Sequence, residues 1–520
     1  MRPCGGEHGE CLRFAVILVA ALAAATSVAC RKIEQGRRLA SGLARDILVA
    51  PGEKAVAFLQ GAVHPDDRSV PEDLFVGDLF LASVSAKAGA ERIGGGVPTL
   101  PAARAFSPGG EWLAYLAHWR FRDGEGELWL AESPGGARRV ADAVSSMGWA
   151  PSGSLLAFVS GGRLMVLDAS KEPAAPAVAL DGVQTFAWAP RSDRLAARAA
   201  AATGGRVEMM DVRSGRLRQV AKGSSDFAFG DDGALYVLGL PGSRGGDRPL
   251  AVVDAFDAAP REIGRATSFA VRNGDVALFS TDRAPGEAFG TLSRISRSGG
   301  APQQVGDRVT DYHFSPRGDL VFLARYDGRA RAGTLTVASR GKPPREIAPR
   351  VQSFTVQGDR VLYVAQAPQK GDFKVELWTA PLDGTSPPGK IDDGVYGYQL
   401  SRDGQTLFWK ARCAGGARSC SLFAAAVDGT TPPRLLATNV AGFDLSADGS
   451  RVLVQQPHHG ASRAVDLGVV SPDAPPRDGA VAPFAMEVDP SSRFVDDRGR
   501  RVVYATMGAS HAGVYLVDVP

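Results

Sequence analysis

A short phrase of apolar and turn-forming residues recurs along the whole chain. It begins with an apolar or aromatic residue, passes through a Ser-Pro, Asp-Gly or similar turn, and ends in an apolar run that reads as a strand, as in residues 106–117 and 314–325. Eleven copies, about 45 residues apart on average, begin at positions 49, 106, 149, 188, 229, 271, 314, 356, 400, 445 and 495. Self-similarity at a period of this length indicates a repeat architecture.

Each unit continues in the same way. A third apolar run often ends in Asp, as in residues 162–168 and 205–211, and a short Arg-rich run follows it. β-branched residues and closely spaced Gly, Pro or Asp turns indicate four antiparallel strands per unit. A small sheet of this kind cannot bury both faces alone, so the units predict the stacked blades of an all-β protein, a β-propeller. The Trp or Phe that starts each phrase should then pack between blades; the alternative is a stacking platform for a ligand.

The last unit lacks a fourth strand. It ends in the apolar run of residues 514–519, whereas residues 37–43 resemble the fourth strand at residues 434–440. We therefore expect the N-terminal strand to complete the last blade and to cover the exposed edge of an open ring. Because single propellers have roughly 4–8 blades, eleven four-stranded blades predict two rings, divided into five and six or into four and seven.

The composition excludes several classes of protein. Of the 520 residues, 44% are hydrophobic and 22% are charged, which excludes a disordered chain, a collagen and a coiled coil. The mean hydropathy of −0.07 excludes a polytopic membrane protein. The 59 basic and 56 acidic residues leave a net charge of +3, which argues against a nucleic-acid partner because such proteins usually carry a basic patch.

The N-terminus has the layout of a secretory signal. Residues 14–25 form an uncharged apolar run that follows Arg2 and Arg13 and precedes the small residues 26–29. The run is too short for a membrane span, which needs about 20 apolar residues. We therefore expect residues 1–29 to be a cleaved signal peptide and the chain to be exported.

Cys30 directly follows the expected cleavage site. The sequence Ser27-Val28-Ala29-Cys30 resembles the lipobox of bacterial lipoproteins, in which the cysteine is lipidated after cleavage. The alternative is a plain cleavage site that leaves Cys30 as a free thiol. The lipoprotein interpretation divides the chain into a signal peptide at 1–29, a lipid anchor, tether and closing strand at 30–46, and blades at 47–520. It locates the protein on the periplasmic or cell-surface side of a bacterial membrane.

Cys413 and Cys420 are the only cysteines after Cys30, and they flank a Gly-rich loop between two strand-like runs. Opposed residues of an antiparallel hairpin lie about 4.5–5.5 Å apart, within the range of a disulfide. A disulfide here agrees with export. The alternatives are two unpaired cysteines or, with less support, a metal site, for which no His or second Cys pair lies nearby in the sequence.

The phrase Phe-Ser-Pro-x-Gly, followed by an apolar strand and a strand ending in Asp, resembles the WD40-like repeats of the TolB C-terminal propeller. Similar blades occur in the propellers of prolyl-oligopeptidase-type and tricorn peptidases. The resemblance covers roughly residues 36–520 and implies a propeller fold, but propellers host unrelated activities. Nothing between Cys30 and Val49 matches the α/β domain that precedes the TolB propeller.

The sequence contains none of the common catalytic or nucleotide-binding motifs. We find no G-x-S-x-G, Walker loop, H-E-x-x-H or C-x-x-C. Ser510 is adjacent to His511, but a hairpin loop explains this pair better than a catalytic triad does. The pair His458-His459 is interpreted as a solvent-facing loop rather than a metal site. We therefore predict no catalytic and no cofactor-binding residues.

Two acidic segments offer oxygen atoms of the kind that bind calcium. One is the insertion 61–78, with Asp66, Asp67, Glu72 and Asp73, and the other is residues 123–127. Neither spacing matches an EF-hand loop, so we interpret both as solvated acidic loops and predict no metal site.

Two functions remain open. The first is a non-enzymatic envelope lipoprotein that binds a protein or peptide through its propeller surface and a membrane through its N-terminal lipid; the absence of catalytic motifs and the tether favour it. The second is a propeller enzyme, or a protein that binds a small ligand or sugar, with its site at the central channel. An exposed apolar patch would favour the first, and convergent Asp, Glu or His residues with perturbed pKa values would favour the second.

Overall fold

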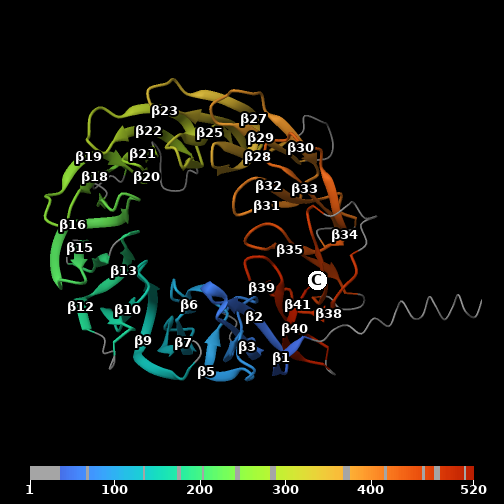
Figure 1. The fold of residues 1–520 in the computed structure, drawn as a ribbon. Coiled ribbons are helices and arrows are strands. Elements are labelled where there is room, and N and C mark those ends of the chain that lie inside the picture. Colours follow the sequence, from blue (N-terminus) through green and yellow to red (C-terminus); the bar gives the residue numbers. More distant parts are fainter. Residues whose placement is uncertain are drawn as a thin grey trace, which may run out of the picture.

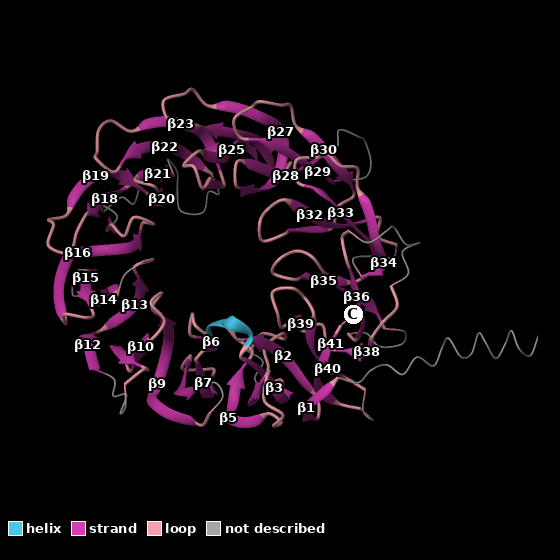
Figure 2. Ribbon diagram, viewed as in Figure 1, coloured by secondary structure: helices cyan, strands magenta, loops and turns pink. Residues whose placement is uncertain are grey.

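The computed structural model describes residues 36–519 except for 66–69, 133–134, 172–176, 192, 202–203, 241–245, 282–288, 367–374, 415–417, 459–462, 474–480 and 509–510. The predicted signal peptide and Cys30 lie outside the described residues. Apart from two 3-10 turns, Pro51–Glu53 and Pro101–Ala103, the regular structure of the described chain is β-strand (Figure 2). Within this described part, no helix has the length and apolar character needed to cross a membrane.

The described strands form eleven four-stranded units, which we number as blades in chain order. Blade 1 contains β2 (Ala44–Val49), β3 (Ala55–Val63), β4 (Val76–Ser83) and β5 (Glu91–Pro98), and blade 2 contains β6 (Arg104–Phe106), β7 (Trp112–Arg120), β8 (Glu125–Glu132) and the first part of β9 (Ala137–Trp149). Blade 3 contains the rest of β9 with β10 (Leu155–Ser160), β11 (Arg163–Asp168) and β12 (Ala177–Asp181), and blade 4 contains β13 (Val183–Trp188), β14 (Arg194–Ala199), β15 (Gly205–Asp211) and the first part of β16 (Arg216–Phe229).

The next four blades repeat this order. Blade 5 contains the rest of β16 with β17 (Leu235–Gly239), β18 (Arg248–Val253) and β19 (Arg261–Ala266), and blade 6 contains β20 (Ser268–Arg272), β21 (Asp275–Ser280), β22 (Gly290–Ser296) and β23 (Gln303–Val309). Blade 7 contains β24 (Tyr312–Phe314), β25 (Leu320–Asp327), β26 (Ala332–Ala338) and the first part of β27 (Arg345–Gln357), and blade 8 contains the rest of β27 with β28 (Arg360–Gln366), β29 (Val375–Pro381) and β30 (Gly389–Asp393).

Three blades complete the series. Blade 9 contains β31 (Gly397–Leu400), β32 (Thr406–Ala411), β33 (Cys420–Ala426) and β34 (Arg434–Val440), and blade 10 contains β35 (Gly442–Leu445), β36 (Val452–Pro457), β37 (Val465–Val470) and β38 (Ala485–Val488). Blade 11 contains β39 (Arg493–Phe494), β40 (Arg501–Thr506), β41 (Gly513–Asp518) and, from the other end of the chain, β1 (Arg37–Ser41).

The long strands β9, β16 and β27 each serve two blades. β9, for example, pairs with β8 from Ala137 to Val144 and with β10 from Val144 to Trp149. The chain changes blade close to Ala143, which has a φ of 49°. A left-handed residue bends the backbone sharply at this point, so one strand leaves the outer edge of a blade and becomes the inner strand of the next.

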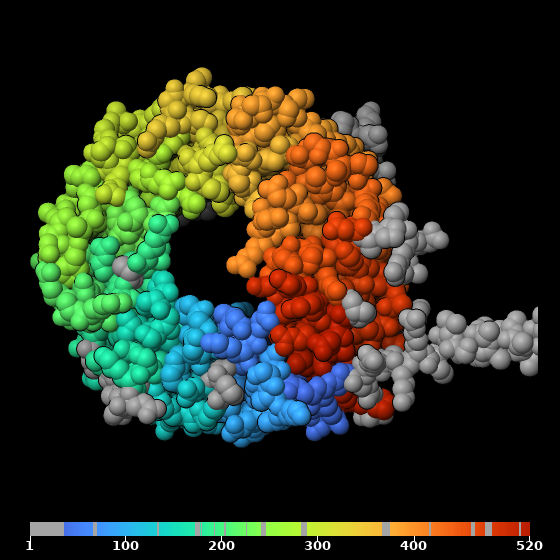
Figure 3. Space-filling model, in the orientation of Figure 1, coloured from blue at the N-terminus to red at the C-terminus, as the bar shows by residue number. Residues whose placement is uncertain are grey.

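All eleven blades lie in a single ring around a central channel (Figures 1 and 3). Every consecutive pair of blades shares a hydrophobic cluster, and a further cluster joins blade 11 to blade 1. The last of these packs Val56 and Phe58 of blade 1 against Val503 and Leu516 of blade 11. The prediction of two rings was therefore wrong. The physical reason is that the same apolar contact repeats at every step, so no blade starts a second ring.

The N-terminal strand closes the ring as predicted. β1 pairs antiparallel with β41, from Arg37 opposite Leu516 to Ser41 opposite Gly513. Arg37 also reaches blade 1, where its guanidinium donates hydrogen bonds to the carbonyl oxygens of Ser83 and Val84, both at 2.9 Å, and of Ala86. β1 therefore covers the edge of one blade and ties it to the next.

The second strand of each blade explains the apolar runs in the sequence. In β10, Leu156, Ala157 and Phe158 are all fully buried although their side chains alternate between the two faces of the sheet. Both faces are covered because each blade lies between two others, and a strand buried on both faces reads as a continuous apolar run. The third strands repeat the pattern more weakly.

The loops lie at two ends of the ring. Turns that join first to second strands and third to fourth strands bond to each other, as in Val212 N–H to the Asp193 carbonyl at 3.1 Å, and we call this end the turn face. Loops that join second to third strands bond to the connections between blades, as in Gly161 N–H to the Ala143 carbonyl at 3.0 Å, and we call this end the loop face. The two faces provide separate surfaces on one ring.

Candidate functional site

The serine of the repeated phrase has a structural role. In four blades it is buried, and its hydroxyl accepts a hydrogen bond from the backbone N–H that starts the second strand; these serines are Ser107, Ser315, Ser401 and Ser446, at 2.9–3.1 Å. In blade 11 the carboxylate of Asp496 takes the same place and accepts from Arg501 N–H at 2.8 Å. The Ser-Pro and Ser-x-Asp motifs of the repeated phrase therefore hold the turn together.

The aromatic residues that start the phrases pack between blades, as predicted. Phe106 and Trp149 are half-buried against the clusters that join their blades to the neighbouring ones. The indole N–H of Trp149 donates to the Ala105 carbonyl of blade 2 at 3.0 Å, and that of Trp188 donates to the Gly148 carbonyl of blade 3 at 2.9 Å. These side chains tie each inner strand to the preceding blade.

Polar groups on the inner strands are used in the same way. The Tyr312 hydroxyl lies 3.2 Å from the Ser268 hydroxyl of the preceding blade, and the Tyr398 hydroxyl lies 2.8 Å from that of Thr355. Burial raises the pKa of both tyrosines. His313 pairs with Asp311 at 3.1 Å, which raises the pKa of the imidazole.

Asp444 on the inner strand of blade 10 has a pKa raised by burial, although Arg493 of blade 11 opposes this shift. Among the acids that the structure describes on the inner wall, Asp444 is the one with a raised pKa. The perturbed inner-wall groups are Tyr312 and His313 of blade 7, Tyr398 of blade 9 and Asp444 of blade 10. All but Asp444 have a hydrogen-bonding side-chain partner in their own or the adjacent blade. They do not assemble a nucleophile, a base and an orienting group.

The candidate segments of the sequence all lie on the loop face. The insertion 61–78 joins β3 to β4, residues 123–127 follow β7, and His458 follows β36. Cys413 follows β32, Cys420 begins β33, and His511 precedes β41. Asp66, Asp67, His459 and Ser510 lie outside the described residues. The topology thus brings to one end of the ring five segments that are far apart in the chain.

Most of these candidate residues already have a partner within the protein. Cys413 and Cys420 form the predicted disulfide. Arg120 pairs with Asp123 at 3.0 Å and with Glu125 at 3.2 Å, and Arg139 pairs with Glu127 at 3.4 Å, so each acid of segment 123–127 already has an arginine partner. Within the described ranges, no group of three or more His, Cys, Asp or Glu side chains is arranged to hold a metal ion.

The described histidines and acids of the other candidate loops contact their own blade or solvent. The His458 ring lies 2.7 Å from Asp466 of its own blade. His511 presents its backbone carbonyl to the Thr506 and Tyr515 hydroxyls, the latter at 3.2 Å. Glu72 and Asp73 are exposed.

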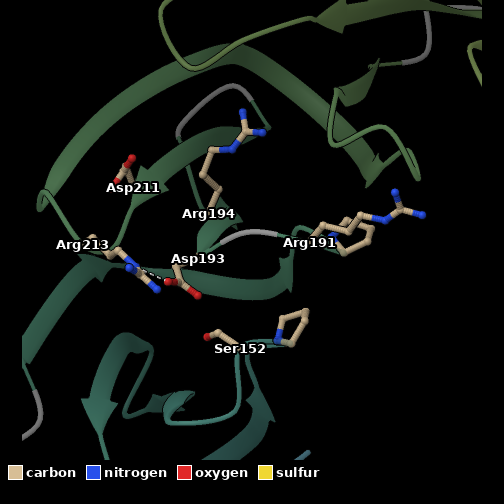
Figure 4. A pocket seen from close by; sticks show the side chains of 8 residues that line it. Ser152, Arg191, Asp193, Arg194, Asp211 and Arg213 are labelled. Carbon is tan, nitrogen blue, oxygen red and sulfur yellow. Dashed lines mark hydrogen bonds and ion pairs between the residues drawn. The ribbon is translucent and has the colours of Figure 1, made fainter.

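A pocket of about 580 Å³ opens on the turn face between blades 3 and 4 (Figure 4). Three turns build it, and each supplies part of the lining. The turn after β9 supplies Pro151 and Ser152; the turn between β13 and β14 supplies Pro190, Arg191, Asp193 and Arg194; and the turn after β15 supplies Asp211 and Arg213. The pocket therefore combines two rigid proline rings with three guanidinium groups and two carboxylates.

Asp193 is the buried anchor of the pocket. Its side chain is 7% exposed, and its Oδ2 accepts a hydrogen bond from Nε of Arg213. Its other oxygen is buried and lies near the Ser152 hydroxyl, without an aligned hydrogen bond in the described structure (Figure 4). Ser152 and Arg213 together hold the pKa of Asp193 below its usual range. The carboxylate thus stays charged and fixes Arg213 at the edge of the pocket.

Asp211 is satisfied by its own turn. It accepts the backbone N–H of Ser214 at 3.0 Å, and this hydrogen bond is the main reason that its pKa is lowered. None of the residues of this pocket was predicted from the sequence. The available signal was the turn at residues 188–194, where Ser192 stands in the place of the usual glycine and Arg191, Asp193 and Arg194 surround it, but their partners Ser152 and Arg213 belong to other turns.

Comparisons with known proteins give no relative in sequence and only remote similarities in structure. No family model matches the chain, and no curated protein does. Similar solved structures include a eukaryotic initiation factor (11% identity, covering 72% of this chain and 96% of that one, TM-score 0.42), a prolyl endopeptidase (13%, 65% and 55%, 0.33) and the tricorn protease (12%, 85% and 46%, 0.26).

The chain is thus an all-β protein that is structurally similar to propeller-containing proteins at low identity. It matches only about half the length of the two peptidases. Similarities this remote carry no argument about function. The fold itself rests on the strand pairing and on the clusters between blades.

Proposed function

We propose that this chain is an envelope protein with TolB-like blades, anchored to a bacterial membrane through a lipid on Cys30, that binds a protein or peptide through its loop face. One observation carries the choice of face. Of the six strongly exposed large hydrophobic side chains among the described residues, five lie at the loop face: Leu43, Val63, Leu240, Tyr396 and Met486.

Three of these five side chains surround the closure of the ring. Leu43 follows β1 and is 57% exposed, Val63 ends β3 and is 65% exposed, and Met486 lies on β38 of blade 10 and is 44% exposed. The Leu43 carbonyl accepts the Gly61 N–H at 3.4 Å, so the segments that carry Leu43 and Val63 are neighbours. Apolar side chains that gather at one end of a soluble ring favour a protein contact there.

The position of the N-terminus also supports the loop face. Gly36 precedes β1 at the turn-face end of that strand, where Arg37 is opposite Leu516. Cys30 is only six residues earlier, which spans at most about 20 Å even when fully extended. A lipid on Cys30 would therefore hold the turn-face rim of blade 11 near the membrane and leave the loop face directed away from it.

The test compares two faces of the same molecule. Leu43, Val63 and Met486 are changed together to Ser, and Leu217→Ser is the matched control, because Leu217 is the sixth exposed side chain (45%) and lies at the turn-face end of β16. Crosslinking and pull-down from native membranes should recover a partner with the parent and with Leu217→Ser. The triple variant should lose most of that partner while keeping its melting temperature.

Retention of the same partner by the triple variant would exclude the loop face. The anchor is tested separately by mass spectrometry of the mature N-terminus, where an unmodified Cys30 would contradict the lipoprotein assignment without affecting the choice of face. A catalytic turnover that is abolished by changing a single inner-wall acid or histidine would instead support an enzyme.

A further inference from the structure

We infer that the pocket between blades 3 and 4 is a second binding site, which takes the carboxylate groups of an acidic peptide segment. The inference does not depend on the loop face, because the pocket lies at the opposite end of the ring. It rests on the charge balance, the layout and the walls of the pocket.

The pocket has more hydrogen-bond donors than its own acids use. Asp193 is engaged by Arg213 and Asp211 by the Ser214 amide, so both carboxylates are committed within the protein. A guanidinium has five N–H donors, and Arg213 contacts Asp193 through Nε while its side chain remains 80% exposed. The lining carries three guanidinium groups and two carboxylates, so its net charge is positive, and the exposed Arg191 and Arg213 bring N–H donors to the opening.

The arginines are spread along the pocket instead of converging on one point. Arg213, Arg194 and Arg191 lie in separate parts of the opening, with Arg191 farthest from the Asp193 pair (Figure 4). A single small anion would engage one of these groups, whereas an extended segment with several carboxylates can engage more than one. Planar guanidinium groups match carboxylate geometry well.

The walls suit a peptide chain. Pro151 and Pro190 line the pocket with rigid rings that lack an N–H group. They offer apolar surface to the methylene groups and backbone of a bound segment. The volume of about 580 Å³ falls within the range of roughly 300–1,000 Å³ that is typical of ligand pockets.

The equivalent turn of blade 7 shows why Arg191 stands out. Arg317 occupies the same position of the repeated phrase and pairs with Asp359 of the next blade at 3.4 Å. Arg191 is exposed and has no ion pair among the described residues. The same turn position thus bridges two blades in one case and faces an open pocket in the other.

The experiment measures binding of the peptide Gly-Asp-Glu-Asp-Gly-amide, labelled with fluorescein on its N-terminal amine, to the mature chain by fluorescence anisotropy. The matched probe replaces its acids with Asn and Gln. Arg191→Gln should weaken binding roughly tenfold, since a hydrogen bond to a charged group is worth a factor of that order or more. Arg317→Gln is the matched control and should bind like the parent. Melting temperatures of both variants confirm that they fold.

Several outcomes would overturn the inference. They are no anisotropy change with the acidic peptide at millimolar concentration, equal binding of the uncharged probe, or equal weakening by Arg317→Gln, which would indicate general attraction to the surface. Two competition arms identify the source of the anion. Inorganic phosphate that competes as well as the peptide would point to a simple anion site, and vesicles containing phosphatidylglycerol that displace the peptide would point to the membrane surface.

Discussion

The turn face and the loop face are built from the same repeat, yet they differ in the interactions that stabilise their segments. On the turn face, short turns are braced by a buried serine and by ion pairs that cross between blades, such as Arg501 to Glu53 at 2.9 Å and Arg297 to Asp232. On the loop face, the segments vary in length and carry five of the six strongly exposed apolar side chains of the described chain. The repeat thus conserves geometry at one end and allows variation at the other, where a partner can be recognised.

The turn face also contains the pocket of blades 3 and 4. There the bracing ion pair, Arg213 with Asp193, lies within one blade, and Arg191 and Arg194 face the opening. A site can therefore form on the braced face where neighbouring turns bring several charged side chains to one pocket.

The largest effect should come from removing the closing strand. Deleting residues 36–41 removes the partner of β41, the buried Leu39 and the Arg37 contacts to blade 1. The local stability of blade 11 should fall by an amount on the order of 5 kcal/mol. Hydrogen exchange should show lost protection for the amides of residues 513–518 that bond to β1. Unchanged protection there would mean that β1 is not needed to hold the edge.

The next largest effect should come from breaking a buried ion pair on the turn face. Asp275 is 6% exposed and pairs with the buried Arg294 and with Arg340. Asp275→Ala leaves Arg294 buried without its partner and should lower the free energy of unfolding by about 3–5 kcal/mol. The control is Asp359→Ala, which breaks the exposed pair with Arg317 and should cost at most about 1 kcal/mol. Urea unfolding with equal effects in both variants would contradict the distinction.

A smaller effect is expected at the disulfide of the loop face. Changing Cys413 and Cys420 together to Ser opens a short covalent loop and should lower stability by roughly 2–3 kcal/mol. Non-reducing peptide mapping of protein isolated from its own compartment should find the bond intact. Because the disulfide lies on the loop face, the variant should leave acidic-peptide binding at the turn face unaffected, and a loss of that binding would show that the two faces are coupled.

The smallest effect concerns pH and Asp444, which lies between the two faces on the inner wall. Burial raises the pKa of this carboxyl above its unfolded value, so the folded state binds the proton more tightly. Stability is then lost as the pH rises from the unfolded pKa through the raised folded pKa. Asp444→Asn should remove this decline and raise the melting temperature slightly at pH 7. Melting curves across pH 3–8 that have the same shape for both proteins would contradict this assignment.

Much of the fold could be predicted because its determinants are local. The phrase, its turns and its apolar runs each occupy a few consecutive residues, and β1 resembles other fourth strands closely enough to be matched with the unfinished last blade. The loop-face disulfide was predictable for the same reason, since seven positions separate its cysteines. The pocket could not be predicted, because Ser152, Arg191 and Arg213 come from three turns and the repeat does not specify which turns meet.

The amino-acid sequence by itself determined the blade, the number of blades and the strand that joins the two ends. These features follow from short-range patterns of apolar and turn residues, which act within one unit. Only the tertiary structure decided that the eleven blades form one ring, that the candidate loops share one end of it, and that arginines of one blade face an open pocket. Such features depend on how blade packs on blade, through contacts between residues of different units, such as the Trp149 indole and the Ala105 carbonyl. No local pattern encodes the angle at which those contacts are made.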